Sequence, residues 1–171
     1  IWSSLFACIL GISIGWITTR TNVPFRRQIE YLAVSPIFLS PFMGAIAWHL
    51  LANERVGILN VMFQNIFPFL PSFNINSMLG ISFVIGIYHS SYIYLFISGA
   101  LKSMDPSLEE AAMISGAGHV KTTLKVTLPL MLPAILSGIL LVFVLATEQF
   151  VIPAVLGWGA GFHVLTTRIY A

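Results

Sequence analysis

The sequence predicts an all-α fold, a polytopic transmembrane helix bundle, from its composition and from the grouping of its apolar residues. Hydrophobic residues make up 57% of the 171 residues and charged residues only 8%, whereas a soluble domain has about 25% charged residues. Folding of a chain this long leaves about 30% of its surface exposed, and a surface so poor in charge would aggregate in water. The composition therefore argues against a soluble enzyme or a nucleic-acid-binding protein.

The apolar residues are grouped into segments of about 20, the length that a helix needs to cross a bilayer. The predicted spans are residues 1–19, 31–52, 78–101 and 130–156, and another span begins near Val164. The run LLVFV within the fourth span is apolar at every position, unlike the alternating pattern of a membrane β-strand. Because the chain begins inside an apolar run, we expect one domain that is truncated at both ends.

The distribution of Lys and Arg predicts the orientation. Six of the eight basic residues lie in the loops between the first and second spans and between the third and fourth spans. Cytoplasmic loops carry the excess of basic residues, so we expect these two loops in the cytoplasm and residues 53–77 and 157–163 outside. In the first outer loop, Ile58, Leu59 and Met62 recur at helical spacing with Asn60 opposite. This pattern predicts an amphipathic helix, which either covers the rim of the bundle or docks an outside partner.

The loop at 102–129 is too long for a simple connection and carries its own helix signals. Asp105 is a good N-cap residue and Pro106 suits the first helical position. Gly116 can adopt a positive φ and end the helix. A second short helix is expected at about 119–127, so the loop is predicted to form a helix–turn–helix on the cytoplasmic side.

The same loop resembles the EAA signature of type I permeases of binding-protein-dependent ABC importers. Glu-Ala-Ala at 110–112, Gly116, Leu128 and Pro129 stand at the family's spacing, and Val126 replaces the usual isoleucine. In that family the loop forms a coupling helix that seats in a groove of the cytoplasmic ATPase. The resemblance implies an ATPase-coupling role for Glu109, Glu110, Ala111, Ala112, Gly116, Ala117, Leu128 and Pro129.

Further stretches extend the resemblance to one half of a ferric-iron transport permease. They are RTNVPFRR at 20–27, MDPSLEE at 104–110, FVIPAVLG at 150–157 and GFHVLTTRIY at 161–170. The resemblance implies a permease subunit of the bacterial cytoplasmic (inner) membrane that passes ferric iron. The implied partners are cytoplasmic ATPase subunits, an extracytoplasmic solute-binding protein, a second permease half or subunit, and lipid.

Other functions stay open beside this one. Permeases for polyamine, thiamine or phosphonate share the same core, and an ion-coupled secondary transporter is a further alternative. The sequence contains no Walker A motif, so we expect a transport subunit that is not itself an enzyme, with ATP hydrolysed by a separate partner. We expect no cofactor and no nucleic-acid partner.

Polar residues inside the predicted spans are candidates for the solute path. A polar belt lies midway along the third span, and Glu148 is the only acidic residue inside a span. Polar groups at this depth must find partners or line a water-filled path. For the belt the alternative is an interhelical hydrogen bond, and for Glu148 it is a position at the rim that reaches water. The candidate path residues are Tyr88, His89, Ser91, Tyr92 and Glu148.

Two patterns suggest chemistry that the predicted spans do not support. Gly11-x-Ser13-x-Gly15 matches the nucleophile elbow of hydrolases, but it lies within a span, where the same spacing of small residues favours close helix packing. Ser90 cannot pair with His89 as nucleophile and base, since adjacent helical residues lie about 100° apart. The four histidines are scattered and the chain has one cysteine, so no metal site is expected.

Overall fold

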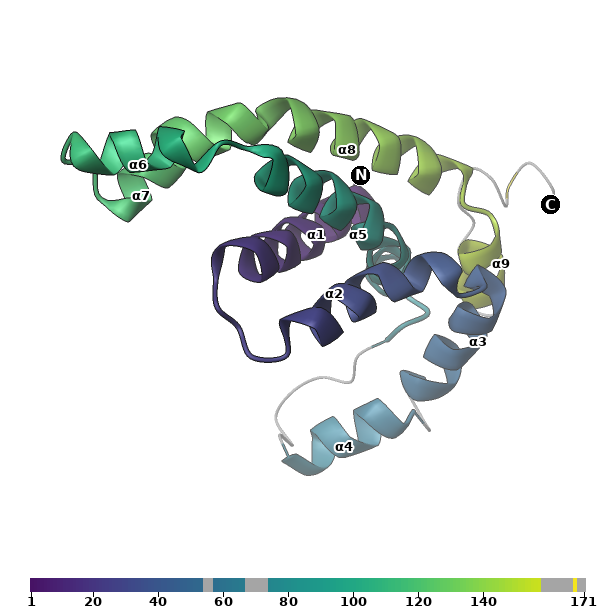
Figure 1. The fold of residues 1–171 in the computed structure, drawn as a ribbon. Helices are drawn as coiled ribbons and strands as arrows, with labels where there is room; N and C mark the ends of the chain where they lie inside the picture. Colours follow the sequence, from purple (N-terminus) through teal and green to yellow (C-terminus); the bar gives the residue numbers. More distant parts are fainter. Residues whose placement is uncertain (54–56, 67–73, 158–167, 169–171) are drawn as a thin grey trace.

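The computed structural model describes residues 1–53, 57–66, 74–157 and 168, and these residues form helices without any strand (Figure 1). Three helices are long and apolar enough to cross a membrane: α1, α5, and a continuous helix from His119 to Glu148. This confirms the all-α fold class. The elements are α1 Trp2–Arg20, α2 Arg26–Val34, the 3-10 helix η1 Ser35–Phe38, α3 Pro41–Leu51, α4 Ile58–Ile66, α5 Met78–Ser103, α6 Pro106–Ile114, α7 His119–Thr122, the π-helical turn η2 Thr123–Thr127, α8 Leu128–Glu148 and α9 Val151–Gly157.

Helix α5 is the centre of the bundle, and α1 lies along it at close range (Figure 1). A β-carbon built on Gly11 would lie 2.5 Å from Cβ of Ile93, and one on Gly15 would lie 2.8 Å from Cγ2 of Ile97. The two glycines therefore let the helix backbones approach each other. The predicted packing role of the Gly11–Gly15 pattern is confirmed, and Ser13 between them is exposed.

The buried apolar residues form two clusters along α5. One joins α5 to α1 and α8, and the other joins α5 to α3 and α9. Helix α8 contributes a narrow stripe, since its buried residues are Met131, Gly138 and Val142. The rest of α8 presents exposed apolar side chains such as Leu140 and Phe143, a surface that suits contact with lipid or with another transmembrane helix.

The second predicted span, 31–52, is not one continuous helix. Helix α2 runs through η1 to Phe38, and α3 begins at Pro41 with its axis turned by 111° from that of the preceding pair. Ser40 is extended, with φ −62° and ψ 126°, the backbone conformation that a following proline favours. The prediction of a continuous helix was wrong, and the segment counts as a fourth crossing only as a bent pair.

The fourth predicted span, 130–156, has different bounds at both ends. Helix α8 ends at Glu148, Gln149 is extended, and α9 is a separate helix. At the other end, the predicted short helix at 119–127 is continuous with α8 through η2. Pro129 has no N–H to donate to the carbonyl of Lys125, which gives a local reason for the wider π-turn just before it. The span predicted near Val164 lies outside the described residues.

The helix predicted in the first outer loop is present as α4, but one of its polar residues faces inward. Asn60 is buried and donates a hydrogen bond from Nδ2 to the carbonyl oxygen of Asn53 at 2.9 Å. Ile58 and Met62 are exposed. Asn60 was predicted to lie on the polar side of this helix, opposite Ile58 and Met62, yet it is buried, because its amide completes the backbone hydrogen bonding just after the end of α3.

Candidate functional site

The loop that carries the EAA residues has the local structure that its sequence predicts. The Asp105 carboxylate accepts a hydrogen bond from the backbone amide of Ser107 at 2.9 Å and so caps α6. This bond and a second one from the Ser107 side chain lower the pKa of the Asp105 carboxyl. Gly116 has a φ of 85°, and Ala117 donates its amide to the carbonyl of Ala112 at 3.1 Å. Together with the bond from the Gly116 amide to the carbonyl of Met113 at 3.0 Å, this bond forms the Schellman motif that closes a helix C-terminus.

Helix α6 lies at the surface of the described structure and has no buried residue. Glu110 and Ala111 are exposed and Ala112 is half-buried. Ile114, one turn after Glu110, is 87% exposed. An exposed apolar side chain beside an acidic residue and a small residue suits docking by another protein.

Leu128 and Pro129, the last two residues of the signature, lie on a different element. Both are exposed at the beginning of α8, directly after η2. The signature therefore covers an exposed helix and the junction that leads from it into a membrane helix.

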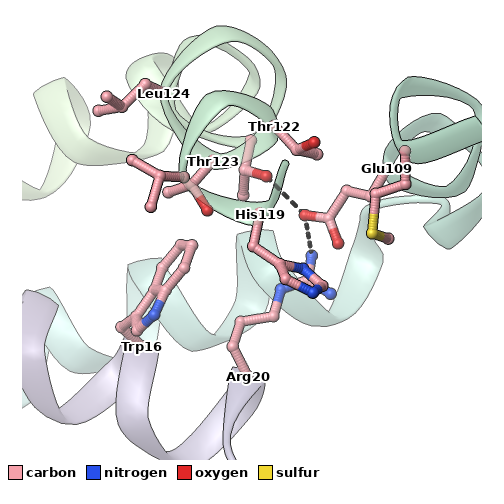
Figure 2. Close-up of a pocket in the computed structure, with 10 residues that line it drawn as sticks. Trp16, Arg20, Glu109, His119, Thr122, Thr123 and Leu124 are labelled. Atoms are coloured by element: carbon pink, nitrogen blue, oxygen red, sulfur yellow. Dashed lines mark hydrogen bonds and ion pairs between the residues drawn. The ribbon is translucent and has the colours of Figure 1, made fainter. Parts of the chain in front are cut away.

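Glu109 points in a different direction from Glu110, toward the interior of the fold. Its Oε1 lies 2.9 Å from Nη2 of Arg20 at the end of α1, and it accepts a hydrogen bond from Oγ1 of Thr127 at 2.6 Å. Figure 2 shows these contacts at one side of a cavity of about 640 Å³, which Trp16 and His119 also line. Sequence reasoning missed Arg20 and Thr127 as partners of Glu109. The available signal was the position of Arg20 at the end of a span on the same side as the EAA loop.

The structure brings three of the five candidate path residues together. Tyr88, His89 and Tyr92 line a cavity of about 140 Å³ beside the bend that separates η1 from α3. The other lining residues are Pro36, Ile37, Leu39, Pro41 and Gln149. Sequence reasoning missed Gln149 and the bend, although Pro36 and Pro41 were a signal for a break.

Hydrogen bonds orient two of the polar side chains of this cavity, Tyr88 and His89. The Tyr88 hydroxyl donates to the carbonyl oxygen of Ser40, 3.3 Å away in the bend. Nδ1 of His89 lies 2.8 Å from the carbonyl oxygen of Ile85. Because a carbonyl oxygen only accepts, Nδ1 carries the hydrogen, and Nε2 is the acceptor of the neutral ring. The cavity thus combines an imidazole, two phenols and an amide at a break in a helix.

Ser91 and Glu148 do not line this cavity. Ser91 is fully buried on another side of α5, and its hydroxyl has no hydrogen-bond partner in the described part of the chain. Glu148 is exposed as the last residue of α8. Among the described residues, no group of three His, Cys, Asp or Glu side chains is placed to hold a metal ion.

Comparisons with known proteins agree with this arrangement. The ferric transport system permease protein FbpB of Actinobacillus pleuropneumoniae is 26% identical over 166 residues, which cover 97% of this chain and 24% of that protein. The chain thus spans about a quarter of the length of this relative.

A solved structure shares the fold. A bacterial ABC transporter involved in the import of alginate, an acidic polysaccharide, matches with a TM-score of 0.70 at 16% identity, over 98% of this chain and 64% of that one. Residues 7–171 match the family described as the binding-protein-dependent transport system inner membrane component. This chain therefore belongs to that family of inner membrane transport components.

Proposed function

We propose that this chain is part of the permease subunit of an ATP-driven importer that passes ferric iron across the cytoplasmic membrane. The observation that carries the proposal is α6, an exposed helix with the EAA residues between two membrane helices. The ferric substrate is supported by the ferric transport relative, which matches nearly the whole of this chain. Energy comes from ATP bound by a separate subunit, and the chain itself breaks no bond.

The exposed face of α6 is the proposed docking site for the ATPase. Ala111 has a small side chain, so a partner can approach the helix backbone closely, while Ile114 supplies apolar area and Glu110 a negative charge. Movement of the ATPase displaces α6, which is tied by short connections to α5 on one side and to α7 on the other. The membrane helices then reorient, and a solute delivered by an external binding protein passes through.

We assign the cavity beside the bend to the solute path. Imidazole nitrogen is a suitable ligand for iron, and His89 presents its ring there together with Tyr88 and Tyr92. A cavity of about 140 Å³ has room for a small ion with a few water molecules. Ser91 and Glu148 lie outside this cavity, so the proposed path includes neither of them.

The test uses the full transporter, reconstituted in vesicles with its ATPase and binding protein. We expect radiolabelled ferric iron to accumulate only when ATP is present. Glu110→Lys reverses the charge on the docking face, and Gly116→Val forces a β-branched residue into a positive φ at a cost of about 1–2 kcal/mol. Both variants should lose ATPase co-purification and uptake at unchanged membrane abundance. Gln28→Lys, at an exposed position of α2, is the matched control and should retain both.

Two results would contradict the proposal. Uptake driven by an ion gradient without the ATPase would favour the secondary transporter. ATP-driven uptake of a polyamine, thiamine or a phosphonate, with no uptake of iron, would keep the mechanism and replace the solute.

A further inference from the structure

The side chain of Glu109 connects α6 to two other elements, the distant α1 and the nearer η2. One carboxylate oxygen, Oε1, contacts both Arg20 at the last residue of α1 and Thr127 at the last residue of η2. Glu109 itself lies in the first turn of α6. A single atom thus links α6 to the end of α1 and to the π-turn that leads into α8 (Figure 2).

This link crosses a gap between α6 and α1. The cavity of about 640 Å³ lies between α1 on one side and α6, α7 and η2 on the other, with Trp16 and Met113 on its walls. The side chains of Arg20 and Glu109 are 23% and 17% exposed, so the pair is largely shielded from water. Since α6 has no buried residue, tight apolar packing does not hold it against α1.

The third member, Thr127, lies where the helix from His119 to Glu148 is irregular. A single π-turn inside an α-helix is rare and is frequent at functional sites. Thr127 is buried at the end of this turn and donates its hydroxyl hydrogen to Glu109. A displacement of Thr127 therefore acts at the irregular turn of this helix.

We propose that Glu109 is a positioning residue that transmits the movement of α6 to α1 and α8. The inference rests on the proposed function, but it assigns Glu109 a role inside the chain, whereas Glu110 faces the partner. When α6 moves, the ion pair between Glu109 and Arg20 displaces the end of α1. The hydrogen bond between Glu109 and Thr127 displaces the π-turn. Both membrane helices then respond to one displacement.

The test measures iron uptake per ATP hydrolysed in the reconstituted full transporter. Glu109→Gln keeps the size of the side chain but removes its charge, and Thr127→Val removes the hydroxyl. We expect each to lower uptake per ATP by about tenfold, which corresponds to the loss of one contact to a charged group. ATPase co-purification and membrane abundance should be unchanged. Thr127→Ser, which keeps the hydroxyl, should retain wild-type uptake per ATP.

Glu30→Gln is the matched control, because Glu30 pairs with two basic side chains, Arg26 and Lys102, that are 45% and 51% exposed. Exposed pairs contribute little, so this variant should retain wild-type uptake per ATP. Arg20→Gln combined with Glu109→Gln should lose no more than either single variant, as expected for two residues that act through one contact.

The outcomes separate this inference from the proposed function. A wild-type protein that retains no ATPase would overturn the proposed function. If wild-type transport is ATP-coupled and Glu109→Gln keeps normal uptake per ATP, the inference fails alone. Equal losses in Thr127→Ser and Thr127→Val, or additive losses in the Arg20 and Glu109 double variant, would also overturn it.

Discussion

Gly11 lies where α1 and α5 approach most closely, and alanine at this position should push the helices apart. The added β-carbon would lie 2.5 Å from Cβ of Ile93 and 2.7 Å from the carbonyl oxygen of Ser90. An ordinary carbon–carbon contact is about 3.5–4.0 Å, so the deficit is about 1 Å. Neither neighbouring atom is the end of a flexible side chain, so relief requires α1 as a whole to shift.

The cost of Gly11→Ala follows from two opposing terms. Overpacking of a well-packed contact typically destabilises a protein by about 1–3 kcal/mol. Replacing a helical glycine by alanine stabilises the helix by about 0.5–1 kcal/mol. We therefore expect a net loss of about 1–2 kcal/mol in the free energy of unfolding. Gly99 is the matched control, because it is an exposed glycine of α5 with no atom within 4 Å of an added β-carbon. Gly99→Ala should stabilise the protein by about 0.5–1 kcal/mol.

Heating the two purified variants in detergent and measuring the folded fraction by size-exclusion chromatography gives their relative stability. The two substitutions are chemically identical and both lie in membrane helices, so their opposite signs isolate the effect of the helix contact. If Gly11→Ala unfolds at or above the temperature of Gly99→Ala, the close approach of α1 and α5 is refuted.

Two further predictions concern the bend and the end of α8. A β-carbon on Gly44 would overlap the Tyr88 hydroxyl and move that hydroxyl away from the Ser40 carbonyl. Gly44→Ala should therefore lower thermal stability more than Tyr88→Phe, which loses one hydrogen bond worth about 1 kcal/mol. Equal thermal stability of the two variants would refute the contact. Glu148→Gln removes an exposed charge, and exposed charges contribute about 0–1 kcal/mol. We expect iron uptake within about twofold of wild type. A larger loss at normal membrane abundance would indicate that Glu148 lies on the solute path.

The sequence predicts best where one residue determines the local backbone. Asp105 caps α6 and Gly116 closes it, as expected, because a cap and a positive φ depend on atoms within a few residues. The small residues of α1 were equally informative, since close helix approach requires the absence of a side chain. These features were readable without knowing which helices are neighbours.

The bend at residues 39–40 was missed for a physical reason. Mean hydropathy over 31–52 is the same whether the apolar residues form one helix or two. Pro36 and Pro41 mark a break, but their positions do not set the direction of the chain after it. The direction depends on contacts with distant residues, such as the hydrogen bond from Tyr88 to Ser40, which joins residues that are 48 positions apart.

The side chains of neighbouring residues on a helix point in different directions around its axis, and this explains which candidate residues the structure brings together. Successive positions differ by about 100°, so Tyr88, His89 and Tyr92 fall within one arc of about 100°, and Ser91 falls outside it. The same rotation separates Glu109 from Glu110. The family resemblance implies a coupling role for both glutamates, yet one pairs with Arg20 inside the fold and the other is exposed. Adjacent acidic residues on a short helix can therefore have different roles in the proposed coupling. One of them faces the partner protein, and the other contacts the membrane helices.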